Sequence, residues 1–189
     1  EPCLIDLGDL PDSGAGTGTN TNYETLLANN GPSHVLIQGL YLGTSVDDEL
    51  EGQPSANALG DGADENGISI SPSLVLVNGG NFDVPLTVTN TTNEIAHVEA
   101  WIDWNGDGDF NDPNEMVMDF DDAFSLFPNS VRINVPMDAV RNTVVGFRLR
   151  ISNEDNMTPY GNFNSGEIED YLIAIDCKQI CLPGAVQKD

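Results

Sequence analysis

The sequence predicts an all-β fold, an antiparallel β-sandwich of jelly-roll or immunoglobulin-like type with a loop-rich acidic N-terminal segment. Three observations support this prediction. From Ile68 onward, apolar and polar residues alternate with the two-residue period of half-buried strands. The alternating stretches are short and are separated by Pro, Gly and Asn, which favour turns. No helical pattern is long enough for an α/β fold.

Residues 1–66 are expected to form a loop-rich acidic segment that packs on the sandwich. The Gly-, Asn- and Thr-rich residues 1–31 predict an irregular arm. Within it, Tyr23–Asn29 is expected to form one or two helical turns. The apolar stretch His34–Leu42 is expected to be a buried strand or extended segment. Residues 47–67 have almost no hydrophobic periodicity, so alone they are typical of disorder, unless their carboxylates wrap cations.

The sandwich itself is expected over residues 67–177, followed by a tail or linker at residues 178–189. Each expected strand has one apolar face, because side chains alternate between the two faces of a strand. Trp104 is expected to point into the core, and Arg148 and Arg150 outward. The clearest predicted strands are Phe82–Thr89, Ala96–Trp104, Met116–Phe120, Val131–Val135, Val145–Ile151 and Glu169–Cys177.

The charge of the chain is strongly negative. It contains 31 Asp and Glu residues against 6 Lys and Arg, a formal net charge of −25. Such a fold repels itself unless bound cations or high salt neutralise it. Nucleic acid and anionic membrane surfaces are disfavoured as partners because both require a basic face. No apolar run approaches the ~18 residues of a membrane helix, and the start at Glu1 suggests a processed protein or an excised segment.

A calcium-binding loop is predicted between two of the expected strands. The stretch W-I-D-W-N-G-D-G-D-F-N-D-P-N-E places oxygen-bearing side chains at alternate positions, with Gly106 and Gly108 between them. Ca²⁺ requires about six to eight oxygen atoms to converge on one point. The stretch also begins like the calcium loop D-x-[DN]-x-[DN]-G. The expected ligands are Asp103, Asn105, Asp107, Asp109 and Glu115.

The far end of this loop departs from the helix-loop-helix calcium pattern. Its twelfth position is Asn114, and Glu115 follows one residue late. Strands rather than helices are expected on both sides. We therefore interpret the stretch as a calcium-clasped turn that helps to hold an acidic sandwich together. The alternative is a polar hairpin loop that binds no metal.

A second cation site is predicted where the last strand begins. Glu167 and Glu169 are expected on one face of that strand and Asp170 on the other. Two alternatives remain, ion pairing with the arginines at positions 148 and 150 or a solvated strand entry. The full set of residues expected for this cation is Glu167, Glu169, Asp170, Asp61, Asp64 and Glu65.

The cysteines are candidates for a disulfide. Cys3, Cys177 and Cys181 lie at the two ends of the chain, and their spacing suits neither a zinc site nor a C-x-x-C redox pair. If the terminal strands are neighbours, Cys3 could bridge to Cys177 or Cys181. A bridge closing nearly the whole chain would stabilise the fold by ~4–5 kcal/mol on the chain-entropy model. The alternative is three free thiols in a reducing compartment.

Catalytic residues are not expected. The chain has no Ser-His-Asp pattern, phosphate loop or H-E-x-x-H. A glycosidase pair of carboxylates is disfavoured because most carboxylates lie on Gly-rich loops that fit metal ligation better. His34 and His97 are isolated and are expected to be packing or surface residues. Trp101 and Tyr160 are candidates for an exposed platform that stacks against sugar rings.

Four stretches resemble a known family. S-G-E-I-E-D-Y-L-I at Ser165–Ile173 resembles the G-E-V-E-D-Y signature of GEVED domains, with Ile168 in place of Val. Trp101–Asp112 resembles the family's other marker. The segments at Asp6–Ser13 and Tyr41–Ala58 resemble the region that often precedes the domain. The resemblance implies a secreted bacterial module, found in large surface or multidomain proteins alongside adhesin-type repeats and not known as a catalyst.

These observations lead to one expected function and one alternative. The first is a non-catalytic, calcium-stabilised structural or adhesive module, a subunit of a surface assembly or fibre, located outside the cell or on its surface. Its expected partners are Ca²⁺ and other copies of itself or neighbouring modules. The alternative is a calcium-dependent carbohydrate-binding module whose partners are glycans.

Overall fold

The computed structural model describes residues 4–14, 18–60, 62, 66–71, 74–123 and 130–176. Within these residues the chain consists of strands and loops, together with a short 3-10 helix at Leu27–Asn29, so the expected all-β, sandwich-like fold is confirmed. No helix in this part of the chain is long and apolar enough to cross a membrane. The strands are β1 (Ile5–Leu7), β2 (Ser33–Val35), β3 (Leu40–Leu42), β4 (Val75–Val77), β5 (Asn81–Pro85), β6 (Val88–Asn90), β7 (Ile95–Ile102), β8 (Met116–Ala123), β9 (Ser130–Asn134), β10 (Thr143–Ser152), β11 (Asn162–Phe163) and β12 (Glu167–Asp176).

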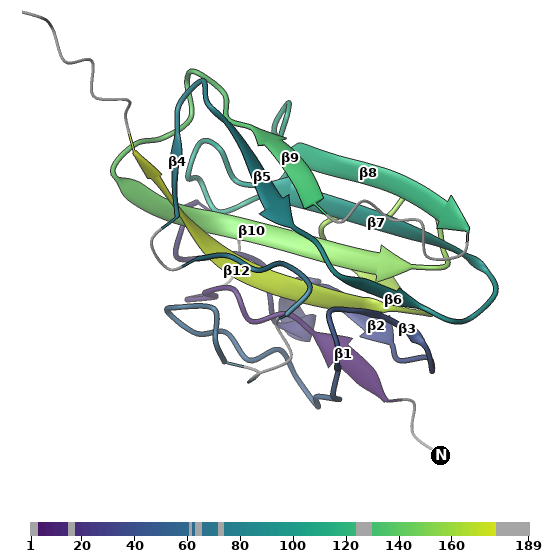
Figure 1. The fold of residues 1–189 in the computed structure, drawn as a ribbon. Helices are drawn as coiled ribbons and strands as arrows, with labels where there is room; N and C mark the ends of the chain where they lie inside the picture. Colours follow the sequence, from purple (N-terminus) through teal and green to yellow (C-terminus); the bar gives the residue numbers. More distant parts are fainter. Residues whose placement is uncertain are drawn as a thin grey trace, which may run out of the picture.

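A five-stranded sheet of order β4-β12-β10-β7-β8 forms the centre of the molecule (Figure 1). Its long strands β12, β10, β7 and β8 are antiparallel neighbours, whereas β4 pairs with β12 in parallel. The register places Phe147 of β10 opposite Tyr171 of β12 and Ile102 of β7. Because directly opposite residues share a face, this row defines one face of the sheet.

The face that carries Phe147 packs against the two-stranded sheets β5-β9 and β3-β6 (Figure 1). The main core lies in this interface and contains Val98, Phe147 and Ile173 from the central sheet with Ile133 and Leu42 from the covering strands. Each of these side chains is fully buried or nearly so. Burying one aliphatic or aromatic side chain stabilises a fold by about 1.5–3 kcal/mol, so this interface drives formation of the sandwich.

The opposite face of the central sheet is also buried. The N-terminal segment, with the sheet β1-β2-β11, covers it and encloses a second apolar cluster (Figure 1). Arg148 and Arg150 point into this layer, and both side chains are 0% exposed. The expectation that they face outward is therefore wrong, because the alternation of β10 marks two faces but does not show that a second layer covers the polar one. The second cluster contains Leu10, Tyr23, Ala58, Trp101, Phe110 and Met157.

Two of the expected strands are divided in the structure. The stretch Phe82–Thr89 forms β5 and β6, which pair with β9 and β3 respectively; between them, Leu86 forms an isolated antiparallel bridge with Ile68. The stretch His34–Leu42 is divided between β2 and β3 at Gly39, whose φ of 86° is in the left-handed region that favours glycine. In both cases the hydrophobic pattern continues through the point at which the chain passes from one sheet to another, so the pattern does not mark the end of the first strand.

The remaining differences concern the ends of elements. Only Leu27–Asn29 of the expected helical turns is helical, and Asn30 ends it with a φ of 61°. The last strand begins at Glu167, two residues earlier than expected from the sequence. Strands β7, β8, β9 and β10 lie within a few residues of their predicted positions. The predicted tail, residues 178–189, lies outside the described residues.

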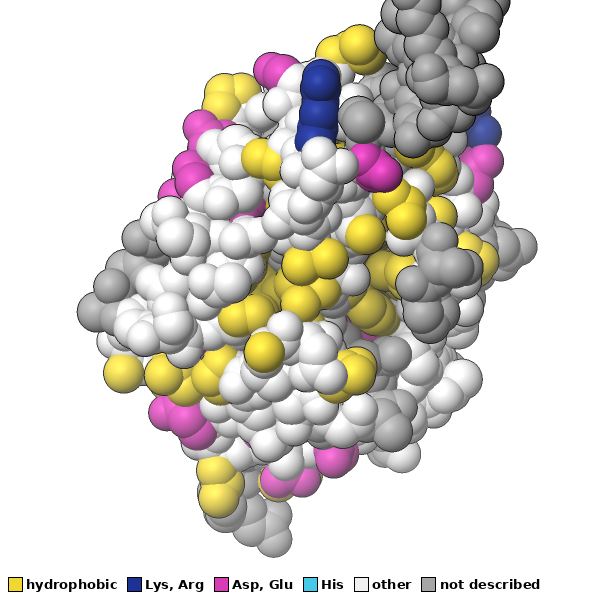
Figure 2. Space-filling view, turned by 90° about the vertical axis from the view of Figure 1, so that its left-hand side faces the viewer, with side chains coloured by type: hydrophobic (Ala, Val, Ile, Leu, Met, Phe, Trp, Pro, Cys, Tyr) yellow, Lys and Arg dark blue, Asp and Glu magenta, His cyan; other side chains and the backbone are white. Residues whose placement is uncertain are grey.

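The surface is hollowed at the end of the molecule where β10 begins and β12 ends, and apolar side chains gather there (Figure 2). The hollow has a volume of about 280 Å³. Pro11, Pro54 and Ala56 of the N-terminal segment line it together with Val144 and Leu172 of the central sheet. The hollow therefore follows the seam between the two layers.

Candidate metal centre

The acidic loop joins β7 to β8 and is anchored at its base by Trp104. The Trp104 side chain is buried in the main core, as expected, and its indole Nε1 donates a hydrogen bond to the carbonyl of Asn114 at 3.0 Å. Gly108 has a φ of 89°, and a Cβ at this position would lie 2.1 Å from the carbonyl oxygen of Thr19. The loop thus packs tightly against the N-terminal segment, and glycine is required at position 108.

Asp103 shapes this loop from inside. Its Oδ1 accepts hydrogen bonds from the backbone N–H of Gly106 at 2.6 Å and of Asp107 at 3.3 Å. Its Oδ2 accepts from the N–H of Gly108 at 3.0 Å and from the hydroxyl of Tyr23 at 2.9 Å. Burial raises the pKa of Asp103, although these donors act in the opposite direction. Four donors match the four acceptor positions of a carboxylate, so Asp103 acts here as the template of the turn.

Glu115 closes the loop from its other end. Its Oε1 accepts from the N–H of Trp104 at 3.0 Å, and its Oε2 accepts from the N–H of Asp112 at 3.0 Å. The side chain is buried, and this burial raises the pKa of Glu115 to about 7. Nearby Asp103 and Asp112 raise it further, whereas the two backbone donors lower it. Glu115 therefore ties both ends of the loop together.

Three other carboxylates converge on the outer side of the loop. Oxygen atoms of Asp107, Asp109 and Asp112 all lie within 4.8 Å of one another. The amide of Asn105 donates to Asp107 at 3.0 Å and to Asp112 at 2.7 Å. The structure thus brings together three of the five predicted ligands, Asn105, Asp107 and Asp109. The other two, Asp103 and Glu115, instead accept hydrogen bonds from the main chain of the loop.

The sequence interpretation missed Asp112. A linear calcium pattern takes its last ligand from the twelfth position, which is Asn114 here. The chain instead turns at residues 112–115, where the N–H of Glu115 donates to the carbonyl of Asp112 at 3.3 Å and Asn114 has a φ of 73°. The Asp-Pro-Asn step at Asp112 is a turn signal that could have indicated this turn.

The donor chemistry of the cluster fits Ca²⁺. This ion takes about six to eight oxygen ligands in flexible geometry. Three carboxylate groups face one another here, and rotation of the Asn105 amide would replace its nitrogen with an oxygen. The described residues of the cluster contribute no nitrogen or sulfur ligand, which disfavours softer metals.

The predicted second cation site has a different arrangement. Glu167 accepts a hydrogen bond from the backbone N–H of Leu42. Glu169 accepts from the N–H of Gly67 at 2.7 Å and from the hydroxyl of Tyr171 at 2.7 Å. Both glutamates are buried and hold the chain that precedes the sandwich. Asp61, Asp64 and Glu65, the other residues expected at this site, lie outside the described residues.

Asp170 points to the opposite face of β12, as the alternation predicts, and forms an ion pair with Arg148. Both its oxygens lie 2.8 Å from the guanidinium, at Nε and Nη2, and both side chains are fully buried. Its Oδ2 also accepts from the N–H groups of Asp9 at 3.0 Å and Leu10 at 3.1 Å. Burial disfavours the charged form of Arg148, but the Asp170 carboxylate outweighs this effect and raises the pKa of Arg148.

The ion-pair alternative is thus the observed one for Asp170. A single cation shared with Glu167 and Glu169 is incompatible with the structure, because the sheet lies between Asp170 and the two glutamates.

Comparison with known proteins supports the resemblance of the acidic loop and of the first half of β12 to the GEVED family. Residues 97–174 match the family model of the GEVED domain. This chain contains a GEVED domain. The match runs from β7 into β12 and includes both the acidic loop and the carboxylates of Glu167, Glu169 and Asp170. No curated protein and no solved structure matched the chain.

The second buried arginine, Arg150, donates its hydrogen bonds to uncharged groups. Arg150 donates from Nε to His34 Nε2 at 2.8 Å and from its other nitrogens to carbonyls that include those of Tyr160 and Gly161, both at 2.9 Å. His34 Nδ1 lies 2.7 Å from the carbonyl of Ser165, so Nδ1 carries the hydrogen and Nε2 accepts. Burial, and then the neighbouring charge of Arg150, lower the pKa of His34. Burial also lowers the pKa of Arg150 to about 9.

The two residues of the predicted aromatic platform differ in their exposure. Trp101 is only 4% exposed because it belongs to the second apolar cluster. Tyr160 is half-buried, and its hydroxyl accepts from the N–H of Phe110 at 3.1 Å. The prediction of an exposed sugar-stacking side chain is therefore wrong for Trp101, whereas for Tyr160 it stays a prediction. The disulfide prediction stays open, because Cys3, Cys177 and Cys181 lie outside the described residues.

Proposed function

We propose that this chain is a non-catalytic structural or adhesive module of an extracellular or cell-surface protein, and that Ca²⁺ stabilises it. The observation that carries the proposal is the convergence of Asp107, Asp109 and Asp112 within 4.8 Å on a loop between two core strands. At that spacing each pair of charges repels by about 1–4 kcal/mol for effective dielectric constants between those of water and a protein surface. A bound divalent cation turns this repulsion into attraction.

The position of the loop explains how a cation would stabilise the whole module. Trp104 at the start of the loop packs in the main core, and Phe110 in its middle packs in the second cluster. A cation held by the intervening carboxylates would fix both anchors relative to each other. Binding at a hundredfold excess over Kd would add about 2.7 kcal/mol to the free energy of unfolding.

The distribution of charge supports the same proposal. Of the chain's 6 basic residues, Arg148 and Arg150 are fully buried, so they do not offset the acidic surface. Arg132 is exposed but already forms an ion pair with Asp83 at 2.7 Å. Such a surface favours cations over polyanionic partners. Calcium-rich surroundings outside the cell, and contacts with other copies or neighbouring modules bridged by cations, are consistent with it.

Calcium titration with thermal unfolding tests the proposal. Chelation should lower the melting temperature by about 5–10 °C, the shift that 2.7 kcal/mol produces in a domain of this size. Asp107→Asn and Asp112→Asn should lower it similarly and abolish the response to chelator. Glu94→Gln, which removes one exposed charge from the β6–β7 turn, is the matched control and should keep the full response. An identical melt of the wild type with calcium and with chelator would refute calcium stabilisation.

The carbohydrate-binding alternative is less well supported, because Trp101, one of the two aromatic side chains expected to carry it, is buried, and Tyr160 is only half-exposed. We therefore retain the structural or adhesive module as the proposed function.

A further inference from the structure

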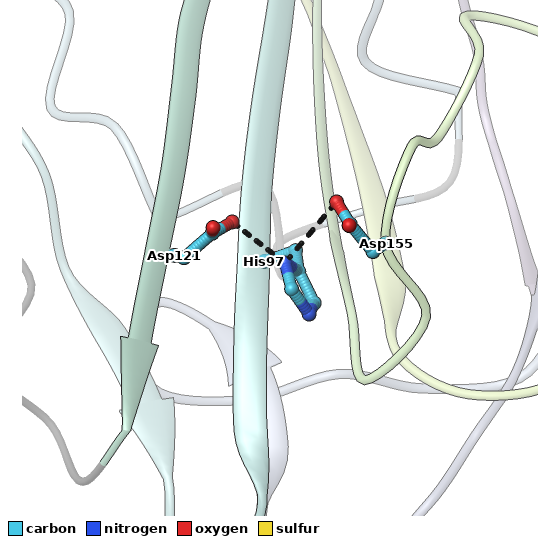
Figure 3. A group of neighbouring side chains, drawn as sticks. All are labelled: His97, Asp121 and Asp155. Atoms are coloured by element: carbon cyan, nitrogen blue, oxygen red, sulfur yellow. Dashed lines mark hydrogen bonds and ion pairs between the residues drawn. The ribbon is translucent and has the colours of Figure 1, made fainter.

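A second group of metal-ligating side chains lies on the central sheet, away from the acidic loop. The Nδ1 of His97 lies 2.7 Å from Asp121 Oδ1 and 3.6 Å from Asp155 Oδ1, and one ligand atom from each of the three residues lies within 4.8 Å of the other two. Figure 3 shows Asp121 and Asp155 on either side of the strand that carries His97, with both carboxylates pointing toward its ring. His97 is largely buried, whereas both aspartates are exposed, so the group opens to solvent.

The fold places these three residues together through strand register. His97 of β7 is the direct antiparallel partner of Asp121 in β8, so both side chains emerge on the same face. On its other side, His97 is paired with Ser152, the last residue of β10. Asp155 follows in the next turn, which Asn156 completes with a φ of 57°. The sequence concealed this group because its members are 24 and 34 residues apart, at positions 97, 121 and 155.

The spacing matches that of ligands around a tetrahedral zinc ion. Nitrogen and oxygen ligands lie about 2.0–2.2 Å from Zn²⁺, which places two of them about 3.3–3.6 Å apart. His97 and Asp155 already have this separation at 3.6 Å, and Asp121 at 2.7 Å is somewhat too close. Asp121 is exposed and at the edge of the sheet, so its side chain is able to move outward by the required ~0.6 Å.

An independent observation on the same face also indicates a cation. Glu99 follows His97 by two residues on β7 and is only 2% exposed. Its Oε1 accepts from the backbone N–H of Met157 at 3.0 Å, while its Oε2 is buried and has no hydrogen-bond partner among the described residues. The carboxylate also interacts electrostatically with Asp119, Asp155 and His97. A buried, unpartnered carboxylate oxygen is costly, and a positive ion nearby would reduce that cost.

A charged imidazolium is the simplest alternative source of positive charge, but it fits this group less well. The single Nδ1–H of His97 can be donated to Asp121, and at 3.6 Å the oxygen of Asp155 is beyond hydrogen-bond distance. A metal ion instead uses the Nδ1 lone pair and both carboxylates at once.

We propose that His97, Asp121 and Asp155 bind a divalent transition-metal ion, for which Zn²⁺ is the probe, with water in the remaining position. The mixed nitrogen and oxygen donors distinguish this group from the all-oxygen cluster of the acidic loop.

Isothermal titration of the full chain with Zn²⁺, in the presence of saturating Ca²⁺, tests this proposal. We expect one zinc ion per chain and at least a tenfold loss of affinity in His97→Gln and in Asp155→Asn, because even the loss of an outer-shell partner weakens metal binding by about 10–100-fold. Asp119→Asn is the matched control, since it removes an exposed carboxylate opposite Glu99 on the same face without touching the group. Asp107→Asn is the control for the acidic loop. Thermal melts verify that each variant is folded, and the exposed position of Asp155 keeps its variant informative if His97→Gln is destabilised.

Three results would overturn the proposal. The first is the absence of a zinc isotherm, and the second is an affinity that changes less than threefold in Asp155→Asn. The third is an equal loss in Asp119→Asn or Asp107→Asn, which would show general attraction to an acidic surface. In the wild type, nitrogen chemical shifts of the His97 ring should also move on addition of Zn²⁺ and stay unchanged with Ca²⁺. None of these readouts depends on whether calcium stabilises the fold.

Discussion

Replacement of Asp170 by Asn is the most direct test of how the two layers are held together. The substitution keeps the size of the side chain and removes its charge. In the native protein, each Asp170 oxygen lies 2.8 Å from the Arg148 guanidinium, and Oδ2 also accepts from Asp9 and Leu10. An asparagine amide has only one oxygen. It must therefore present N–H groups to at least one of these donors and leave Arg148 charged, buried and without its counterion.

The expected loss of stability is about 3–5 kcal/mol, the cost of removing one partner from a buried ion pair. Domains are stable by about 5–15 kcal/mol in total, so Asp170→Asn is expected to be only marginally folded at room temperature. The segment at Asp9 and Leu10 should be affected most, because its N–H groups lose their acceptor. Gly8, the residue before Asp9, lies so close to Asp170 that a Cβ there would be 2.2 Å from its Oδ2, so the backbone of this segment packs directly on the carboxylate.

Urea unfolding monitored by circular dichroism measures the loss, and hydrogen exchange at Asp9 and Leu10 locates it. Asp83→Asn is a matched control because Asp83 and Arg132 form the same bidentate geometry, at 2.9 and 2.7 Å, on the surface. Exposed pairs contribute little, so this variant should unfold at nearly the wild-type urea concentration. The reasoning is refuted if Asp170→Asn loses less than about 1 kcal/mol, or no more than Asp83→Asn.

Two further predictions concern other buried polar contacts in the second layer. Tyr23→Phe removes a hydroxyl that donates to Asp103 at 2.9 Å and accepts from the Gly146 N–H at 2.7 Å; we expect a loss of about 1–3 kcal/mol in urea unfolding, and unchanged stability would show that the hydroxyl is dispensable. Because the pKa of His34 is lowered in the folded protein, the unfolded chain binds the extra proton below about pH 6.5, and stability falls as the pH decreases through that value. The wild type should lose up to about 1.4 kcal/mol per pH unit more than His34→Gln, whose amide oxygen can still accept from Arg150; parallel pH profiles would contradict this.

The period-two pattern predicted the central strands because their main-core face is continuously apolar. The apolar residues of β10 occur at every second position without interruption, and all of them lie on the main-core face, as expected: Val145, Phe147, Leu149 and Ile151. The same pattern could not predict the second layer. A polar residue such as Arg148 on the other face is equally compatible with water and with a buried carboxylate, and the partner is 22 residues away in sequence.

The acidic loop shows a similar division between what is local and what is not. The alternation of Asp and Gly identified the loop, its flanking strands and the buried Trp104 at its base. It could not distinguish carboxylates that turn inward from those that turn outward. Asp103 turns inward because it directly follows β7 and meets the hydroxyl of Tyr23, which comes from the N-terminal segment 80 residues earlier. Such long-range contacts leave no periodic signal.

The carboxylates of the stretch Ser165–Ile173 bind main-chain groups in earlier parts of the chain. Glu167 and Glu169 bind the main chain at Leu42 and Gly67, and Asp170 binds it at Asp9 and Leu10. All of these binding partners precede residue 97, where the family match begins.

The matched region is therefore not energetically self-contained in this chain. Excised at residue 97, it would expose a sheet face bearing two arginines that are fully buried in the whole protein, and three carboxylates would lose their main-chain partners. Within β12, alternation delivers these carboxylates to both faces of one strand, so a single short stretch binds segments in both layers. The buried carboxylates of Glu167, Glu169 and Asp170 thus organise the main chain, whereas the cation sites that we propose use the acidic groups of the loop and of the cluster beside His97, which are open to solvent.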